Sequence, residues 1–194
     1  LNGGTPVYYD CRPENGFLPD PEQMAALVTQ HTRAIVLINP NNPSGASYPR
    51  ELLQAVVRLA QRPRLLLMAD EIYHGILYDE ACFEPLAPLA GDLPCLSFGG
   101  LSKVHRACGY RVGWVSLSGD VARSADLHHA MDLIGALRLC ANVPGQWAVP
   151  AALQGPDTIS ALTAPGGRLY EARRAVIESV AKSDFLSLSV PQGA

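Results

Sequence analysis

Lysine is scarce in this sequence, and one of its two lysines stands where an α/β protein could use a primary amine. Only Lys103 and Lys182 are lysines among the 15 basic residues. Lys103 follows an apolar run and a Gly-Gly-Leu-Ser turn, at the carboxyl end of a predicted strand, where open α/β sheets bind ligands. A lysine desolvated there has a lowered pKa, and its neutral amine can attack a carbonyl and form a Schiff base. Position alone equally allows a surface lysine in a loop, and Lys182, in a charged helical stretch, is predicted to be solvated.

An acidic residue follows the preceding apolar run. Asp70 comes directly after residues 65–69, Leu-Leu-Leu-Met-Ala. An acid in this place can cap a helix, or bind magnesium as in a Walker B strand. The magnesium interpretation requires an upstream G-x-x-x-x-G-K-[ST] loop, and residues 1–69 contain no lysine. The sequence therefore excludes a complete P-loop site, and it also lacks the G-x-G-x-x-G fingerprint of a dinucleotide-binding Rossmann site.

Two further segments carry polar groups that could bind a ligand. Residues 39–45 read N-P-N-N-P-S-G, a stiff turn that can hold a carboxamide in one orientation but is by itself only a turn signal. Arg111 lies eight residues beyond Lys103, in Gly-Tyr-Arg-Val-Gly-Trp. An arginine between small residues can present two parallel N–H groups to a phosphate, although a surface ion pair is the commoner role.

The elements that must position these residues follow from the hydrophobic pattern. Five runs read as strands: 5–9, 34–38, 65–69, 95–98 and 111–117, and their continuous apolar character predicts burial on both faces. Amphipathic helices over 21–30 and 50–61 separate the first three runs, which implies parallel pairing. A helix within 120–142 with one buried stripe and a half-exposed helix over 167–182 follow. The pattern predicts an α/β fold with a mostly parallel sheet flanked by helices.

Composition bounds the classes of function. With 194 residues, 48% hydrophobic and 17% charged, the chain is predicted to be globular rather than disordered. A net charge of -3 gives no basic surface for nucleic acid or anionic lipid, and the apolar runs are shorter than the roughly 20 residues of a membrane span. Five scattered cysteines without a C-x-x-C pair predict neither a disulfide framework nor a zinc site. We therefore expect a reducing, cytoplasmic setting.

Three motifs in order carry a resemblance to a known family. They are N-P-N-N-P-S-G at 39–45, A-D-E-I-Y at 69–73 and G-L-S-K-V-H-R-A-C-G-Y-R-V-G-W at 100–114. Together they resemble the fold type I, class I/II aminotransferases, which use pyridoxal 5'-phosphate. The segments R-L-C-A-N-V-P at 138–144 and P-G-G-R-L-Y-E at 165–171 look most like the bacterial glutamate-pyruvate (alanine) aminotransferase branch.

The resemblance implies a role for each motif residue that would touch the cofactor ring. Lys103 would carry the internal aldimine and then move the proton between the substrate Cα and C4' of the cofactor. Asp70 would keep the pyridine nitrogen protonated, so that the ring acts as an electron sink. Asn42 and Tyr73 would hydrogen-bond the phenolic oxygen of the ring and lower the pKa of the aldimine. On this resemblance Lys103, Asp70 and Tyr73 are the predicted catalytic residues.

The resemblance also implies how the cofactor phosphate would be held. Arg111 would pair with it. Many relatives place a phosphate-binding serine where this sequence has Gly100, so Ser102 is the predicted hydroxyl contact. By the same analogy, the Asn42–Pro43 peptide bond is expected to be cis.

The resemblance extends over the whole chain and implies part of a longer protein. Residues 1–165 would be the core of the large cofactor domain, and residues 166–194 the interdomain helix and the start of the small domain. A chain that starts at Leu1 without an initiator Met agrees with a fragment. The family's Gly-rich phosphate turn, the aromatic residue on the ring and the arginine for the substrate carboxylate would lie outside it. We expect a homodimer, with activity only in the intact parent protein.

The expected function is transamination of an amino acid, alanine or glutamate, with a 2-oxo acid such as pyruvate or 2-oxoglutarate. Two alternatives stay open at the level of sequence. One is another enzyme with the same cofactor, such as a carbon-sulfur lyase or an aminocyclopropane-carboxylate-forming relative, because these share all three motifs. The other is a non-catalytic aminotransferase-like domain that binds a ligand.

Overall fold

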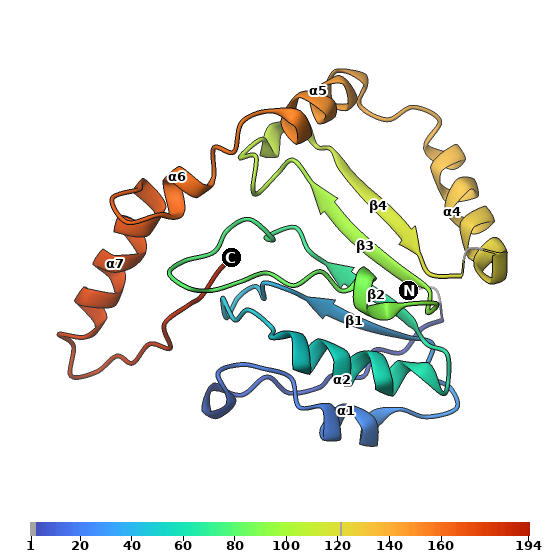
Figure 1. The fold of residues 1–194 in the computed structure, drawn as a ribbon, viewed down its shortest axis with the longest axis horizontal. Coiled ribbons are helices and arrows are strands. Elements are labelled where there is room, and N and C mark those ends of the chain that lie inside the picture. The colour runs from blue at the N-terminus through green and yellow to red at the C-terminus, as the bar shows by residue number, and fades with distance from the viewer. Residues whose placement is uncertain (1–2, 121) are drawn as a thin grey trace.

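A single sheet of four strands, in the order β1-β2-β3-β4, forms the centre of the molecule in the computed structural model, which describes residues 3–120 and 122–194 (Figure 1). The strands are β1 (Ala34–Ile38), β2 (Leu66–Asp70), β3 (Cys95–Gly100) and β4 (Gly113–Ser118). β1, β2 and β3 are parallel, and β4 is antiparallel to β3. The predicted α/β fold with a mostly parallel sheet is therefore confirmed. Leu1, Asn2 and Val121, which fall within the predicted 1–165 unit, lie outside the described residues.

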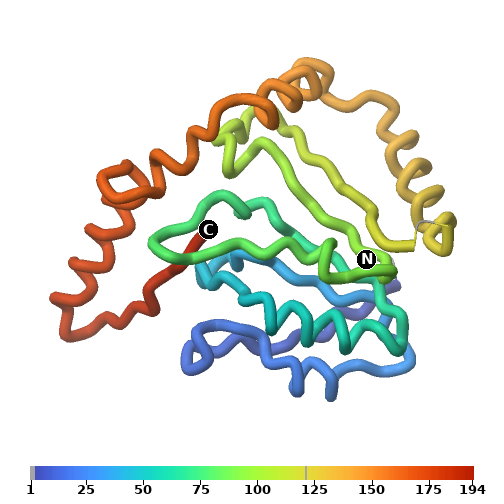
Figure 2. Tube along the Cα trace, in the orientation of Figure 1, coloured from blue at the N-terminus to red at the C-terminus, as the bar shows by residue number. Residues whose placement is uncertain are grey.

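Two groups of helices surround the sheet. On one side, α2 (Arg50–Gln61) packs against β2, α3 (Ala87–Ala90) packs against β3, and α1 (Pro21–Leu27) packs against α2. The later ones form an arch over the other side (Figure 2): α4 (Ala125–Arg138), α5 (Val143–Gln154), α6 (Ser160–Thr163) and α7 (Arg168–Val180). Short 3-10 helices span Pro13–Asn15, Cys108–Tyr110 and Ala122–Ser124. Among the described residues, every helix is too short or too polar to span a lipid bilayer.

The core forms between α2 and one face of the sheet. α2 has the bounds that the sequence predicts, and Pro63 just beyond it cannot continue a helix. Its buried residues recur at helical spacing and pack against the inward-pointing residues of β1 and β2. These contacts include Leu53, Val56, Val57 and Ala60 from α2, with Ile35, Leu37, Leu67 and Ala69 from the sheet.

Truncating a core residue of α2 tests this packing. Leu53 is only 1% exposed, so Leu53→Ala is expected to lower the free energy of unfolding by about 2–5 kcal/mol, because the lost methyl groups leave a cavity. Arg58→Ala, on the exposed side of the same helix, is expected to change it by less than about 0.5 kcal/mol. Urea denaturation of the full-length protein measures both values. Equal effects of the two substitutions would contradict this description of the core.

One predicted strand does not form, and one helix ends earlier than predicted. Residues 5–9 do not form a strand, and Tyr8 is 82% exposed, because an apolar run pairs only where a neighbouring strand lies beside it. α1 ends at Leu27 rather than at residue 30, since Val28 is already extended. Thr29 and Thr32 then form a turn in which the Thr29 N–H donates to the Thr32 hydroxyl at 2.9 Å, and this bond competes with the helical pattern.

The predicted burial of both sheet faces is also wrong. Burial alternates along β1: Ile35 and Leu37 point into the core, whereas Val36 between them is 50% exposed. β4 has no fully buried residue among its six described positions. The cause is that α1, α2 and α3 cover one face only, so successive side chains alternate between the core and the open face.

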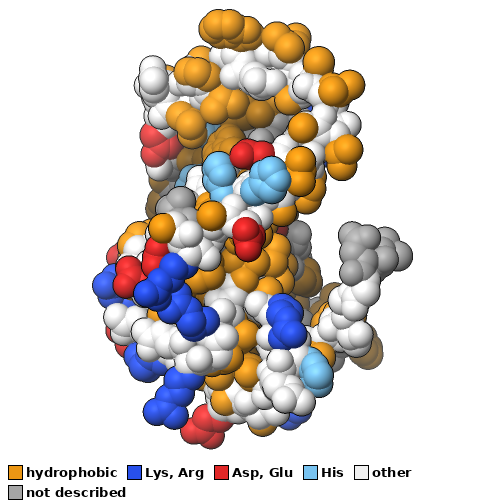
Figure 3. All heavy atoms as spheres, turned by 90° about the vertical axis from the view of Figure 1, so that its right-hand side faces the viewer, with side chains coloured by type: hydrophobic (Ala, Val, Ile, Leu, Met, Phe, Trp, Pro, Cys, Tyr) orange, Lys and Arg blue, Asp and Glu red, His pale blue; other side chains and the backbone are white. Residues whose placement is uncertain are grey.

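The apolar stripe predicted on the helix after residue 120 is exposed rather than buried. α4 has no buried residue along its described length, and Leu137 is 85% exposed. Figure 3 views the molecule from the right-hand side of Figure 1, and it shows apolar side chains gathered over the upper part, where α4 and α5 lie. The residues are Leu133, Ile134, Leu137, Leu139, Val143, Trp147 and Leu153. The predicted stripe therefore faces away from the core that the described residues form.

Candidate active site

The segments that carry the predicted site residues meet at one edge of the sheet. Because β1, β2 and β3 are parallel, their carboxyl ends lie together, and antiparallel β4 begins at the same edge, where Gly113 pairs with Gly100. Asn42 follows β1, Asp70 ends β2, Lys103 follows β3, and Arg111 precedes β4. This edge is the place where open α/β sheets bind ligands.

Tyr73 is the centre of a polar cluster at this edge. The Asn42 side-chain amide donates a hydrogen bond to the Tyr73 hydroxyl, with 3.0 Å between nitrogen and oxygen. The Lys103 ammonium lies over the Tyr73 ring, 5.2 Å from its centroid, within the range of a cation–π interaction. Three residues from three separate motifs are thus brought together by the loops that follow β1, β2 and β3. The Asn42–Pro43 peptide bond is cis, as predicted, and so is Asn39–Pro40.

The electrostatics of Lys103 differ from the prediction of a desolvated amine. Lys103 is exposed, and its pKa is raised rather than lowered, first by its hydrogen bond with Tyr73 and next by the charge of the same group. Of the two alternatives that position allowed, the described residues agree with the surface lysine: the side chain is open to water, so the desolvation that would lower the pKa is outweighed by the neighbouring oxygen. The surroundings of Lys103 among the described residues therefore favour its ammonium form.

Removing the Tyr73 hydroxyl tests this cause. In Tyr73→Phe without cofactor, the pKa of Lys103 is expected to fall, so that the amine loses its proton at lower pH than in the parent protein. The measurement is a pH titration of the ¹³Cε resonance of Lys103 by NMR. The matched control is Tyr8→Phe, whose side chain is highly exposed. An unchanged or raised titration midpoint in Tyr73→Phe would contradict the account.

Asp70 lies on the open face of the sheet. Ala69 packs into the core below β2, so the alternation of side chains places Asp70 on the other face, in register with Ile38 and Phe98. Asp70 Oδ1 accepts a hydrogen bond from the backbone N–H of Ile72 at 3.2 Å, within a turn, so the helix cap that the sequence allowed does not form. Asp70 also contributes to the raised pKa of Lys103, as the smallest of its causes. The carboxylate therefore lies within electrostatic range of the amine.

Glu71 is a residue of this region that the sequence did not single out for a role. Its Oε1 atom accepts a hydrogen bond from the backbone N–H of Leu86 at 2.9 Å. Burial raises the pKa of this carboxyl above its usual value, and the Leu86 N–H partly opposes the shift. The hydrogen bond between Glu71 and Leu86 thus holds the chain after β2 in place, while the neighbouring Asp70 lies on the open face. The only sequence signal was its place in the A-D-E-I-Y motif.

Arg111, Cys108 and Ser102 form a linked turn beside the cluster. The Arg111 guanidinium donates to the Cys108 carbonyl at 3.0 Å, and the Cys108 thiol donates to the Ser102 carbonyl at 2.8 Å. Arg111 is exposed and has a left-handed backbone with φ of 51°. Since this hydrogen bond to Cys108 uses a single N–H group, further donors of the guanidinium remain for an anion. Cys108 was not predicted to have a role here.

Two cavities of the described residues are lined by other residues than Asn42, Tyr73 and Lys103. One of about 490 Å³ is lined by His74 and His105, which follow Tyr73 and Lys103 closely in sequence, and by Asp157. Another of about 340 Å³ lies along α7. The cluster is therefore an open surface site at the sheet edge within the described residues.

The arrangement combines chemically distinct groups in one place. It offers a primary amine for an aldehyde and a carboxylate for a cationic ring nitrogen. It also offers an amide and a phenol for a ring oxygen, and a guanidinium for a phosphate. This set suits a planar, phosphorylated aldehyde with a basic ring nitrogen.

Comparisons with known proteins agree with the motifs. A family model described as aminotransferase class I and II matches residues 1–193. The glutamate-pyruvate aminotransferase AlaA of Escherichia coli K12 is 43% identical over 194 residues, which are 100% of this chain and 48% of that protein. The alanine aminotransferase of Mycobacterium tuberculosis H37Rv is 44% identical over 194 residues, which are 45% of its length. The chain thus spans about half the length of the curated relatives it matches.

Solved structures agree with this result. A crystal structure of an aminotransferase from Escherichia coli superposes with a TM-score of 0.94 at 43% identity, covering 97% of this chain and 46% of that one. An alanine aminotransferase from Pyrococcus furiosus gives a TM-score of 0.90 at 31% identity, covering 99% of this chain and 48% of that one.

Proposed function

The chain belongs to the class I and II aminotransferase family, and on this premise we propose that the full-length protein is a pyridoxal-phosphate-dependent transaminase. The amino donor is alanine or glutamate, and the acceptor is a 2-oxo acid such as pyruvate or 2-oxoglutarate. The observation that carries the proposal is the convergence of Asn42, Tyr73 and Lys103 from three motifs. The relatives named as glutamate-pyruvate and alanine aminotransferases support the choice of substrates.

The residues present fit this cofactor by the chemistry of their donor groups. When bound, pyridoxal phosphate supplies an aldehyde that takes up the amino group and a ring that accepts electrons. Lys103 would attach the cofactor through its amine, and would then act as base and acid for the proton at the substrate Cα. Because its surroundings favour the ammonium form, Lys103 must lose a proton before it can act as a nucleophile.

The remaining side chains would hold the ring and its phosphate. Asp70 would stabilise a proton on the ring nitrogen, since a carboxylate raises the pKa of a neighbouring cationic acid. The Tyr73 hydroxyl accepts from Asn42, so its own proton is free to donate to the phenolic oxygen. Arg111 would bind the phosphate with paired N–H groups, and the Ser102 hydroxyl is the proposed second contact.

We also propose the wider setting of the site. Residues 1–165 would form the core of the cofactor domain, and residues 166–194, which contain α7, would be the interdomain helix and the start of a second domain. The exposed apolar side chains of α4 and α5 support burial in a homodimer of the full-length protein. The free thiols Cys82, Cys108 and Cys140 are exposed, which favours a reducing, cytoplasmic compartment.

A steady-state assay of the full-length protein tests the reaction. With alanine and 2-oxoglutarate, pyruvate and glutamate are expected in equal amounts, and only when both substrates are present. Release of ammonia and pyruvate without the 2-oxo acid would contradict transamination and indicate a lyase. Binding of the cofactor without turnover of either kind would indicate a ligand-binding domain.

A further inference from the structure

The last residues of the chain contact the loop that carries Asn42. We call residues 191–194 the strap. The Gly45 carbonyl oxygen accepts two hydrogen bonds from it, one from the Gln192 N–H and one from the Gly193 N–H, each at 2.8 Å. The Gln192 side-chain oxygen accepts a third hydrogen bond, from the Ser47 N–H, at 3.0 Å. The strap is thus bonded to the N-P-N-N-P-S-G loop across about 145 residues of sequence.

The strap is also bonded to the chain that carries Tyr73. The Tyr78 N–H donates to the Gln192 carbonyl at 2.9 Å, and the Ala194 N–H donates to the Ile76 carbonyl at 3.1 Å. Leu77 and Gly193 form an antiparallel bridge between these contacts. The strap therefore joins Gly45, three residues after Asn42, to Ile76, three residues after Tyr73.

The three segments meet at close range. A Cβ atom at Gly45 would lie 2.4 Å from the Cβ of Pro191, and one at Gly193 would lie 2.6 Å from the Ile76 carbonyl oxygen. Gly45 also has a φ of +71°, which L side chains rarely adopt. Contacts this tight leave little freedom for the two loops to move apart.

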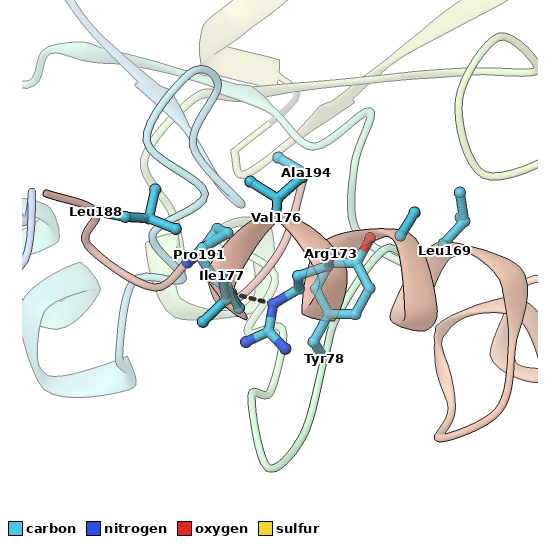
Figure 4. A pocket seen from close by; sticks show the side chains of 9 residues that line it. Tyr78, Leu169, Arg173, Val176, Ile177, Leu188, Pro191 and Ala194 are labelled. Carbon is cyan, nitrogen blue, oxygen red and sulfur yellow. Dashed lines mark hydrogen bonds between the residues drawn. The ribbon is translucent and has the colours of Figure 1, made fainter. Parts of the chain in front are cut away.

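Arg173 of α7 holds the strap from its other side (Figure 4). Its Nε atom donates to the Pro191 carbonyl at 2.9 Å, and its guanidinium pairs with Asp79, also at 2.9 Å. The same group lies over the Tyr78 ring, 4.8 Å from the centroid, and its side chain is only 11% exposed. Arg173 is therefore committed to this structural role, and the strap is fixed to α7 as well as to both loops.

We propose that the strap sets the relative position of Asn42 and Tyr73, and that Gln192 is a positioning residue for this pair. The Gln192 backbone is hydrogen-bonded to Gly45 in one segment and to Tyr78 in the other. Its side chain accepts an additional hydrogen bond from the Ser47 N–H. The effect on the cofactor rests on the proposed function, in which the Tyr73 hydroxyl accepts from Asn42 and donates to the ring oxygen. The effect on the loops themselves does not.

The test compares Gln192→Ala with Gln192→Glu, which keeps a side-chain acceptor for the Ser47 N–H. Gln61→Ala is the matched control, at the exposed end of α2. In the full-length protein without cofactor, hydrogen–deuterium exchange at Ser47 is expected to become about tenfold faster in Gln192→Ala alone. The Gln192 side chain is exposed, so its removal should leave the fold intact. Exchange within α2 should therefore match that of the parent protein, which verifies that the variant is folded.

With pyridoxal phosphate bound, the second readout is the pH midpoint of the lysine-dependent visible absorbance. Weaker donation to the phenolic oxygen disfavours its ionised form, so the midpoint of Gln192→Ala should rise by roughly half a pH unit. Gln192→Glu should restore the parent value.

The two proposals fail in distinguishable ways. A parent protein without a lysine-dependent band would overturn the proposed function, while the exchange experiment would still decide whether Gln192 holds the loop. If the band is present, an unchanged midpoint in Gln192→Ala would overturn the positioning role. The same conclusion would follow if Gln61→Ala gave an equal shift, or if Gln192→Glu failed to restore the midpoint.

Discussion

Lys103→Ala in the full-length protein is expected to abolish the visible absorbance of bound pyridoxal phosphate that depends on this lysine, and to lower kcat/KM by roughly 10⁴-fold. One substitution removes both the amine that attaches the cofactor and the group that moves the proton at the substrate Cα. The Tyr73 ring beside it cannot replace a primary amine. Absorbance spectra and steady-state kinetics measure the two effects on the same preparation.

Lys182→Ala is the matched control, because it removes the same charge from the other lysine of this chain. Lys182 is exposed and follows α7, away from the sheet edge. Its loss is expected to leave the spectrum and kcat/KM within about twofold of the parent protein. A visible band that persists in Lys103→Ala, or that disappears in Lys182→Ala, would assign the amine to a different residue.

Asp70→Asn is expected to lower kcat/KM by roughly 10²- to 10³-fold, the cost of removing one electrostatic contact to a developing charge. An amide has no negative charge with which to stabilise a proton on the ring nitrogen. Its side-chain oxygen can still accept from the Ile72 N–H, so the turn after β2 should persist. Kinetics with alanine and 2-oxoglutarate give the magnitude, and thermal unfolding verifies that the fold is kept.

The neighbouring acid provides the control for Asp70. Glu71→Gln also removes a carboxylate, yet it keeps the oxygen that accepts from the Leu86 N–H. Burial raises the pKa of Glu71, so the folded protein disfavours its charged form more than that of an ordinary surface acid. A neutral glutamine in its place is therefore expected to disturb the fold little. We expect less than about a fivefold change in kcat/KM. If Glu71→Gln were as severe as Asp70→Asn, the ring partner would not be Asp70 alone.

The features set by local pattern could be predicted from the sequence. The apolar spacing of α2 and the proline after it determine where this helix begins and ends. The three motifs follow apolar strands, so parallel pairing of those strands brings their carboxyl ends to one edge. The meeting of Asn42, Tyr73 and Lys103 was therefore predictable, whereas their catalytic roles stay predictions.

Features that depend on what covers a surface could not be predicted in this way. The same apolar pattern describes Leu53, which is buried, and Leu137, which is exposed, because burial needs a second surface that the pattern does not contain. For the same reason the position of Lys103 could not decide between a desolvated amine and a surface lysine, and its raised pKa reflects a tyrosine 30 residues away in sequence. No pattern in the residues around Gln192 predicts a contact with the loop that carries Asn42.

The most direct test of the central claim is to locate the covalent attachment of the cofactor. The full-length protein is incubated with pyridoxal phosphate, reduced with borohydride and digested, and the modified peptide is identified by mass spectrometry. We predict that the reduced cofactor is found on the peptide that contains Lys103, and that it is lost in Lys103→Ala. A label confined to other lysines, with unmodified Lys103, would contradict the account.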